Sequence, residues 1–242
     1  MHKSWIAVVA LAGLLAGCTD TQQAEKQATA ETRKTEWTWL EGAKKDLDAK
    51  RQQIAGLQAQ AAAGADVAAQ LDTSTRELDK AVEVFGGRLA AYINGDPPVY
   101  GEPLKPEQKA AARMKSSEDM VIAQEFIALG GDYRKAIDIY NSALALDSDN
   151  PQLKAALAAA EANRFMTAER FAQIKKGMTQ DQVRAALGIP LLRNMKDYPD
   201  KKVSAWFYPK NDAGEAAGIW FNDKKVAYQV TFDAVKSQSA GQ

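Results

Sequence analysis

The chain has 242 residues, and its 31 lysines and arginines balance its 31 aspartates and glutamates, so the formal net charge is zero. This balance argues against a nucleic-acid partner, because phosphates are bound through an excess of basic side chains. Histidine and cysteine occur once each, at His2 and Cys18, which excludes a disulfide within one chain and the usual zinc ligand sets.

The first 18 residues have the parts of a bacterial secretory signal. Lys3 supplies the positive start, Ser4 to Gly17 form an apolar run, and small residues precede Cys18. The run is shorter than the roughly 20 apolar residues that span a bilayer. Leu15-Ala16-Gly17-Cys18 resembles the bacterial lipobox, so residues 1–17 are expected to be a lipoprotein signal peptide. An ordinary signal peptide with a chance cysteine is the alternative.

In lipoproteins of this kind the cysteine carries acyl chains, including palmitate, and becomes the first residue of the mature protein. The resemblance therefore implies lipidation of Cys18 and a membrane partner through the N-terminal lipid. An aspartate directly after the cysteine is the family's signal for retention in the inner membrane. Thr19 stands there and Asp20 comes one place later, so the resemblance implies the outer membrane, facing the periplasm.

Removal of the signal would also remove His2 from the mature protein. Without a histidine or a free thiol, Ser-His-Asp and Cys-His nucleophile arrangements are excluded. Carboxylates and lysines remain, but no acid pair stands in an aromatic cleft motif of the kind that glycan cleavage would need. We therefore expect no enzyme activity, no catalytic residue, no metal site and no cofactor.

Residues 18–35 are polar, and the stretch from Thr19 to about Lys34 lacks any large apolar side chain. They are expected to form a flexible tether, because such a stretch buries too little apolar area to offset its chain entropy. Apolar residues then recur with helical spacing over residues 36–94, with a break near Gly64. Two amphipathic helices folded back as a hairpin are predicted, and a coiled coil with another molecule is the alternative.

Three prolines and two glycines interrupt residues 94–103, and Pro106 then suits a helix start. Residues 106–165 are predicted to be helical, with helices from 107 to 129, from 133 to 146 and from 151 to about 164. The first pair resembles one tetratricopeptide (TPR) repeat. The matching residues are Gly131, Asp132, Tyr133, Ala136, Ile137, Tyr140, Ala143, Leu144 and Leu146.

This TPR-like unit departs from the family pattern. Met120 and Gln124 replace an aromatic residue and a glycine, the proline after the second helix is delayed to Pro151, and no second copy follows at a 34-residue period. Repeats of this kind normally need about three copies for stability, so the unit must pack against its neighbours. A generic helical hairpin is the alternative.

Residues 166–235 are predicted to form a small ααβββ domain. Thr167 can cap a short helix, and Thr179 with Gln182 forms a capping box for a second. Three stretches rich in strand formers follow, at 203–208, 218–221 and 226–232. Helices this short need a sheet to cover, so the expected fold class is α+β, with a three-stranded antiparallel meander after the all-α region.

The spacing in this segment resembles the SmpA/OmlA (BamE-like) family. The family signature is a Gly-Met-Thr turn, a valine four residues after the threonine, and then Leu-Gly-x-Pro. Here it stands as Gly177, Met178, Thr179, Val183, Leu187, Gly188 and Pro190. We interpret these residues as structural, because glycines, threonine and proline serve as helix caps and stops while valine and leucine serve as core. The resemblance implies envelope-protein partners, including components of barrel assembly.

The aromatic residues Trp206, Tyr208 and Trp220 are the candidate interaction surface. Strand side chains alternate, so Trp206 and Tyr208 share one face of the sheet, and an exposed indole would favour a protein partner. The function expected is an outer-membrane lipoprotein acting as a non-enzymatic protein-protein interaction adaptor, in outer-membrane protein assembly or envelope maintenance. The alternative is a periplasm-facing inhibitor or ligand-binding module.

Overall fold

A computed structural model of the chain describes residues 16–99 and 101–236, with side chains from residue 29 onward. It divides into two compact units, Met1–Leu104 and Lys105–Gln242. Each unit is described by itself below.

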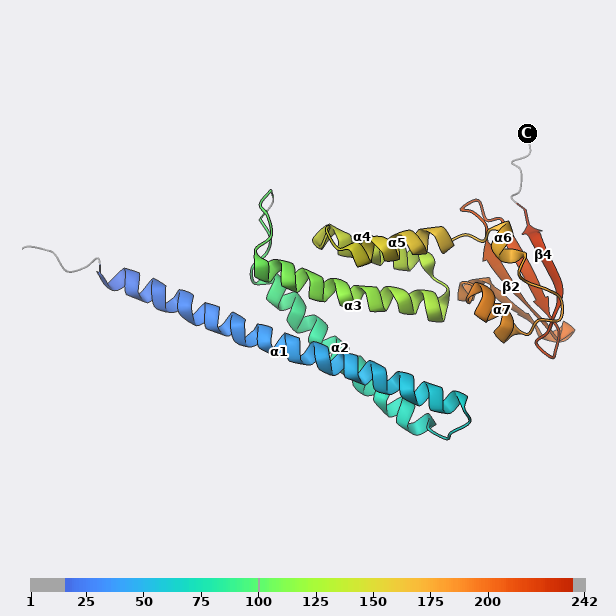
Figure 1. The fold of residues 1–242 in the computed structure, drawn as a ribbon, viewed down its shortest axis with the longest axis horizontal. Coiled ribbons are helices and arrows are strands. Elements are labelled where there is room, and N and C mark those ends of the chain that lie inside the picture. The colour runs from blue at the N-terminus through green and yellow to red at the C-terminus, as the bar shows by residue number, and fades with distance from the viewer. Residues whose placement is uncertain (1–15, 100, 237–242) are drawn as a thin grey trace, which may run out of the picture. The chain divides into compact units, whose positions relative to one another are not determined.

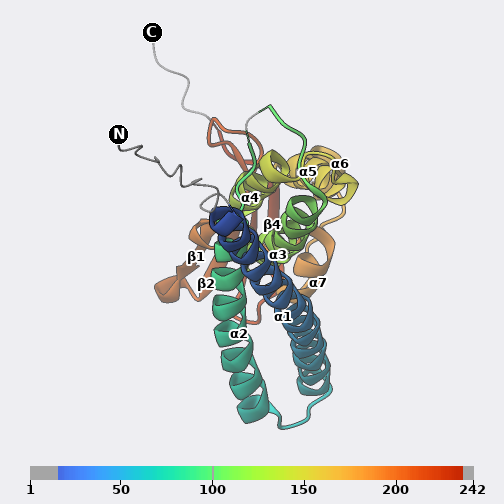
Figure 2. The same ribbon diagram turned by 90° about the vertical axis from the view of Figure 1, so that its left-hand side faces the viewer.

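The first unit is a hairpin of two long helices, α1 (Ala16–Ala62) and α2 (Ala68–Asn94). Figure 2 shows the two helices running side by side to the loop that joins them. Leu40, Leu47, Phe85 and Leu89 are buried, because their spacing places them on one face of each helix. The predicted intramolecular hairpin at 36–94 is therefore what the structure shows.

Polar and aromatic contacts hold the end of α2 against α1. The Arg88 guanidinium donates from Nε to Glu36 Oε1 at 2.7 Å and lies 3.5 Å from the centre of the Trp39 ring. The hydrogen bonds from Arg88 lower the pKa of the Glu36 carboxyl. Trp37 packs on Tyr92 with ring centres 5.4 Å apart.

The predicted tether at 18–35 differs from the structure, in which α1 already begins at Ala16. The composition explains this result, because alanine, glutamine, glutamate and lysine are all good helix formers. A segment without large apolar residues can therefore extend a packed helix. The cleavage position expected before Cys18 also falls within α1.

The second unit begins with three helices, α3 (Pro106–Gly130), α4 (Tyr133–Leu146) and α5 (Pro151–Asn163), which lie beside one another in Figure 1. Asp132 and Asn150 cap α4 and α5 by accepting hydrogen bonds from backbone N–H groups. Small residues let these helices approach closely around Tyr140. Their buried core comprises Ala123, Ala136, Tyr140, Ala143, Leu153 and Ala160.

The C-terminal part of this unit contains the short helices α6 (Ala168–Phe171) and α7 (Gln180–Leu187) and a sheet. The strands are β1 (Met195–Tyr198), β2 (Val203–Pro209), β3 (Ala216–Phe221) and β4 (Ala227–Val235). All neighbouring strands are antiparallel, in the order β1-β2-β3-β4. Short 3₁₀ turns at Leu192–Asn194 and Pro199–Lys201 flank β1.

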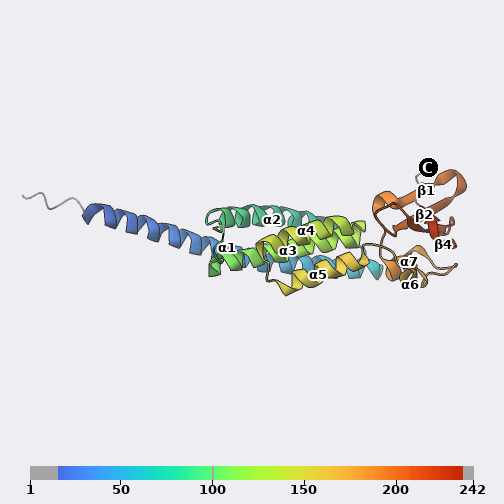
Figure 3. The ribbon, with the colours of Figure 1, turned by 90° about the horizontal axis from the view of Figure 1, so that it is seen from above.

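The α+β fold class is confirmed, but the strand number differs from the prediction. The sheet has four strands rather than three, because β1 was not recognised. Figure 3 shows α6 and α7 on one side of the sheet. The helices therefore cover one sheet face, as expected of elements too short to be stable alone.

Candidate functional site

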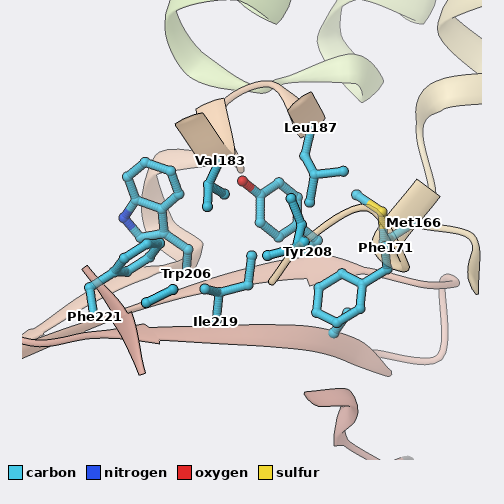
Figure 4. Close-up of a cluster of buried hydrophobic side chains, with 11 residues drawn as sticks. Met166, Phe171, Val183, Leu187, Trp206, Tyr208, Ile219 and Phe221 are labelled. Atoms are coloured by element: carbon cyan, nitrogen blue, oxygen red, sulfur yellow. The ribbon is translucent and has the colours of Figure 1, made fainter. Parts of the chain in front are cut away.

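Trp206 and Tyr208 lie in the core beneath the helices and not on an exposed surface. Trp206 is 2% exposed and Tyr208 4% exposed. In Figure 4 both side chains rise from the sheet toward Val183 and Leu187 of α7. The prediction of these two residues as an exposed interaction surface is therefore wrong, because their sheet face is the one that the helices cover.

Trp220 lies on the opposite sheet face, where it is only partly buried. Its ring meets Phe207 edge-on, with ring centres 5.7 Å apart. Gly218 makes room for the indole, because a Cβ there would lie 2.8 Å from a Trp220 ring atom. Trp220 thus remains a candidate contact residue, paired with Phe207.

The signature turn joins the start of α7 to the sheet. The Gly177 N–H donates to the Ala227 carbonyl and the Ala227 N–H donates to the Met178 carbonyl, both at 2.8 Å. Thr179 and Gln182 form the predicted capping box. Gly177 has φ +92°, a conformation that glycine adopts without steric cost. The backbone bonds to Ala227 and the Thr179–Gln182 capping box thus satisfy the hydrogen-bonding groups of this turn.

The end of α7 is closed by the second half of the signature. Val183, Leu187 and Pro190 are buried. Gly188 has φ +78° and ψ −179°, a region that is essentially restricted to glycine. The Tyr208 hydroxyl donates to the Gly188 carbonyl at 3.0 Å, and burial raises the pKa of Tyr208. In the structure these residues contribute to the turns, the caps and the core around α7.

Cys18 lies within the backbone range of α1, but its side chain is outside the described part of the chain. Its lipidation remains a prediction. Among the described residues, no helix combines the length and the apolar character needed to cross a bilayer. In the same part of the chain, no group of three or more histidine, cysteine, aspartate or glutamate residues could hold a metal ion.

An apolar groove of about 410 Å³ lies within the second unit, between the end of α3 and the segment that follows Pro190. Leu129 is 72% exposed and Leu192 is 59% exposed. Exposed apolar side chains gathered in one groove are typical of a binding surface. The groove is lined by residues that include Ile122, Glu125, Phe126, Leu129, Leu191 and Leu192.

Gly131 joins the two walls of this groove. It ends α3 with φ +62°, and a Cβ at this position would lie 2.4 Å from the Ile189 carbonyl oxygen and 2.7 Å from the Leu191 nitrogen. Only glycine allows this approach, because no real Cβ fits that close to backbone atoms. The turn at Gly131 in the TPR-like segment thus packs against the backbone at the end of the Leu-Gly-x-Pro signature.

Sequence reasoning missed this groove. The available signal was the spacing of Ile122, Phe126 and Leu129, which places three large apolar residues on one face of α3. The same spacing is typical of a helix face buried in a core. Leu191 and Leu192 stand in a connection that carries no periodic pattern, so nothing in the sequence linked them to α3.

Two short helices on one face of a four-stranded antiparallel sheet define a small α+β domain with a closed apolar core. The family model described as "Outer membrane protein assembly factor BamE domain" matches residues 164–240. The chain therefore carries a BamE-like domain at its C-terminal end, as the signature indicated. No curated protein and no solved structure matches the chain.

Proposed function

We propose that this protein is an outer-membrane lipoprotein, held by acyl chains on Cys18 and facing the periplasm, that acts as a non-enzymatic adaptor in outer-membrane protein assembly. The observation that carries the proposal is the family match at residues 164–240. The description of that family names an assembly factor of the outer membrane. The lipobox-like sequence before Cys18 supports the same location independently.

The chemistry of the domain supports a binding role. Several of its polar side chains form caps and turns, as with Thr179 and Gln182, or bonds between elements, as with the Tyr208 hydroxyl and the Gly188 carbonyl. Its buried large apolar residues form one cluster that includes Phe171, Trp206 and Phe221. A rigid domain of this kind presents surfaces to a partner without supplying reactive groups.

The elements outside the matched residues support an adaptor rather than a domain acting alone. The α1–α2 hairpin and helices α3 to α5 precede the BamE-like domain. The groove beside Leu129 combines residues from α3 and from the matched domain. An adaptor needs more than one contact surface, and these elements provide candidates.

The groove also favours a second candidate, a periplasm-facing inhibitor or ligand-binding module. Its volume of about 410 Å³ falls in the range of small-molecule sites. This candidate predicts one tightly held soluble enzyme or ligand, whereas the adaptor predicts membrane-assembly proteins.

Affinity capture from detergent-solubilised envelope tests the proposal. The bait is the full chain with a C-terminal tag, and the control is an unrelated outer-membrane lipoprotein carrying the same tag. We expect barrel-assembly components to be enriched with the bait over the control. Enrichment of a single soluble hydrolase would support the inhibitor, and no enrichment over the control would refute the adaptor.

A further inference from the structure

A second pocket of about 230 Å³ adjoins the apolar groove, and Asp132 and Leu191 line both. The second pocket differs in charge from the groove. Three arginines line it, Arg134, Arg164 and Arg193, together with two aspartates, Asp132 and Asp212. Asp212 is paired with Arg164, and the Asp132 carboxylate accepts a hydrogen bond from the Lys135 N–H at the start of α4. A molecule that lies in the groove and passes Leu191 would therefore meet Arg134 and Arg193.

Two of these arginines have no partner of opposite charge. Arg164 is paired with Asp212, but among the described residues neither Arg134 nor Arg193 takes part in an ion pair. Both side chains are exposed. Guanidinium groups bind carboxylates through paired N–H donors, so this end of the surface is complementary to an acidic side chain.

The groove, by contrast, disfavours acidic groups. The exposed Glu125 side chain lines it, and its negative charge would repel a carboxylate beside α3. The apolar side chains of Ile122, Phe126 and Leu129 provide the contact area there. The surface is thus polarised, with an apolar and mildly acidic end next to α3 and a basic end beyond Leu191.

We propose that these two pockets together bind a segment of a partner protein in which large apolar side chains stand next to an aspartate or glutamate. The apolar side chains would fill the groove, and the carboxylate would lie between Arg134 and Arg193. The inference rests on the proposed adaptor function, and it names the chemistry that one of the partners must present.

Site-specific photocrosslinking in cells tests this inference with the full chain. Benzoylphenylalanine is placed at Leu129, at Leu192 and, as a control, at Val84, which is also an exposed aliphatic residue, on α2, at 54%. The adducts are purified, and mass spectrometry identifies the crosslinked peptide of the partner. The expected result is one partner segment, shared by positions 129 and 192 and missing at position 84, that is apolar and has an acidic residue at one end.

Substitutions in the basic pocket and in the apolar groove test each half of the surface through the yield of the crosslinked adduct. Arg134→Glu combined with Arg193→Glu should reduce the adduct at position 192 by roughly ten-fold, because two attractive contacts become repulsive. Leu129→Glu should reduce the same adduct by a similar factor, whereas Val84→Glu should leave it unchanged. Melting curves equal to that of the unaltered chain would show that these surface variants remain folded.

Four outcomes would overturn the inference: adducts with lipid, adducts with a second copy of this chain, adducts with a segment lacking an acidic residue, or no adduct above the level at position 84. These failures are distinct from failure of the proposed function. If the Leu129→Glu variant still captures barrel-assembly components, the adaptor stands and the groove proposal falls. If the crosslinked segment has the expected chemistry but belongs to a protein unconnected with assembly, the groove proposal stands and the assembly role falls.

Discussion

The hydroxyl of Tyr208 links the sheet to the end of α7 through one partly buried hydrogen bond to the Gly188 carbonyl. Its ring fills the core beside Leu187 and Met166. Burying a tyrosine this deeply is favourable only if its hydroxyl finds a partner. At the scale of single residues, this bond explains why an aromatic side chain that first suggested an interaction surface is part of the framework.

Removing the hydroxyl should therefore weaken the domain. We expect Tyr208→Phe to lower the free energy of unfolding by about 1 kcal/mol, because the Gly188 carbonyl loses its donor. Tyr228→Phe is the control, since Tyr228 is 42% exposed and should change little. Urea denaturation of both variants measures the difference, and equal midpoints would show that the bond contributes nothing.

Tyr208 also makes the stability of the domain depend on pH. Desolvation raises the pKa of Tyr208 in the folded state, so folding favours the protonated phenol. Its contribution is fully present below the pKa of an unfolded tyrosine, which is about 10, and is lost as the pH rises above that value. The unaltered chain should thus lose more stability than Tyr208→Phe between about pH 10 and 12, and parallel stability curves would contradict this.

The backbone conformation of Gly188 leads to a second prediction for the same loop. Its φ of +78° with ψ of −179° is strained for any residue with a Cβ, at a cost of about 1–3 kcal/mol. We expect Gly188→Val to lower the melting temperature of the domain. Gly130→Val is the matched control, because Gly130 is helical and has open space where a Cβ would be. Identical melting curves would mean that the loop adapts without cost.

At the scale of elements, the α1–α2 hairpin depends on a narrow apolar seam. Phe85 is 2% exposed while its neighbour Val84 is 54% exposed. Phe85→Ala should destabilise the hairpin by about 3–5 kcal/mol through lost burial and a residual cavity. Val84→Ala should have almost no effect. Hydrogen exchange of α1 and α2 amides distinguishes the two variants, and full protection in Phe85→Ala would argue against the seam.

The helices were predictable because their signals are local. Apolar spacing and caps such as Thr167 and Thr179 depend on residues three or four places apart. The Gly-Met-Thr turn and Leu-Gly-x-Pro spacing were equally local. These patterns sufficed to predict the α+β class and the BamE-like domain.

Features that depend on distant contacts were not predictable. Strand β1 reads Met195-Lys196-Asp197-Tyr198 and is mostly exposed at the sheet edge, so it lacks the alternation of a half-buried strand. The sequence placed Trp206 and Tyr208 on one face, but only the position of α7 shows that this face is covered. The groove beside Leu129 depends likewise on how closely Gly131 approaches Ile189.

At the scale of the whole molecule, the proposed function requires a lipid anchor at Cys18. We expect Cys18→Ala to abolish outer-membrane fractionation and leave soluble or unprocessed protein, because several acyl chains together make membrane release negligible. Thr19→Ala serves as a control that keeps the cysteine. Recovery of the Cys18→Ala protein in the outer membrane at the unaltered level would contradict lipid anchoring.

The central claim is that a lipid-anchored chain works by holding assembly proteins at the outer membrane. Native mass spectrometry of the tagged protein, purified in mild detergent from outer membranes, tests it most directly. We predict a particle whose mass equals the acylated mature chain beginning at Cys18 plus at least one barrel-assembly component. A chain without acyl groups and without a bound protein would contradict the account.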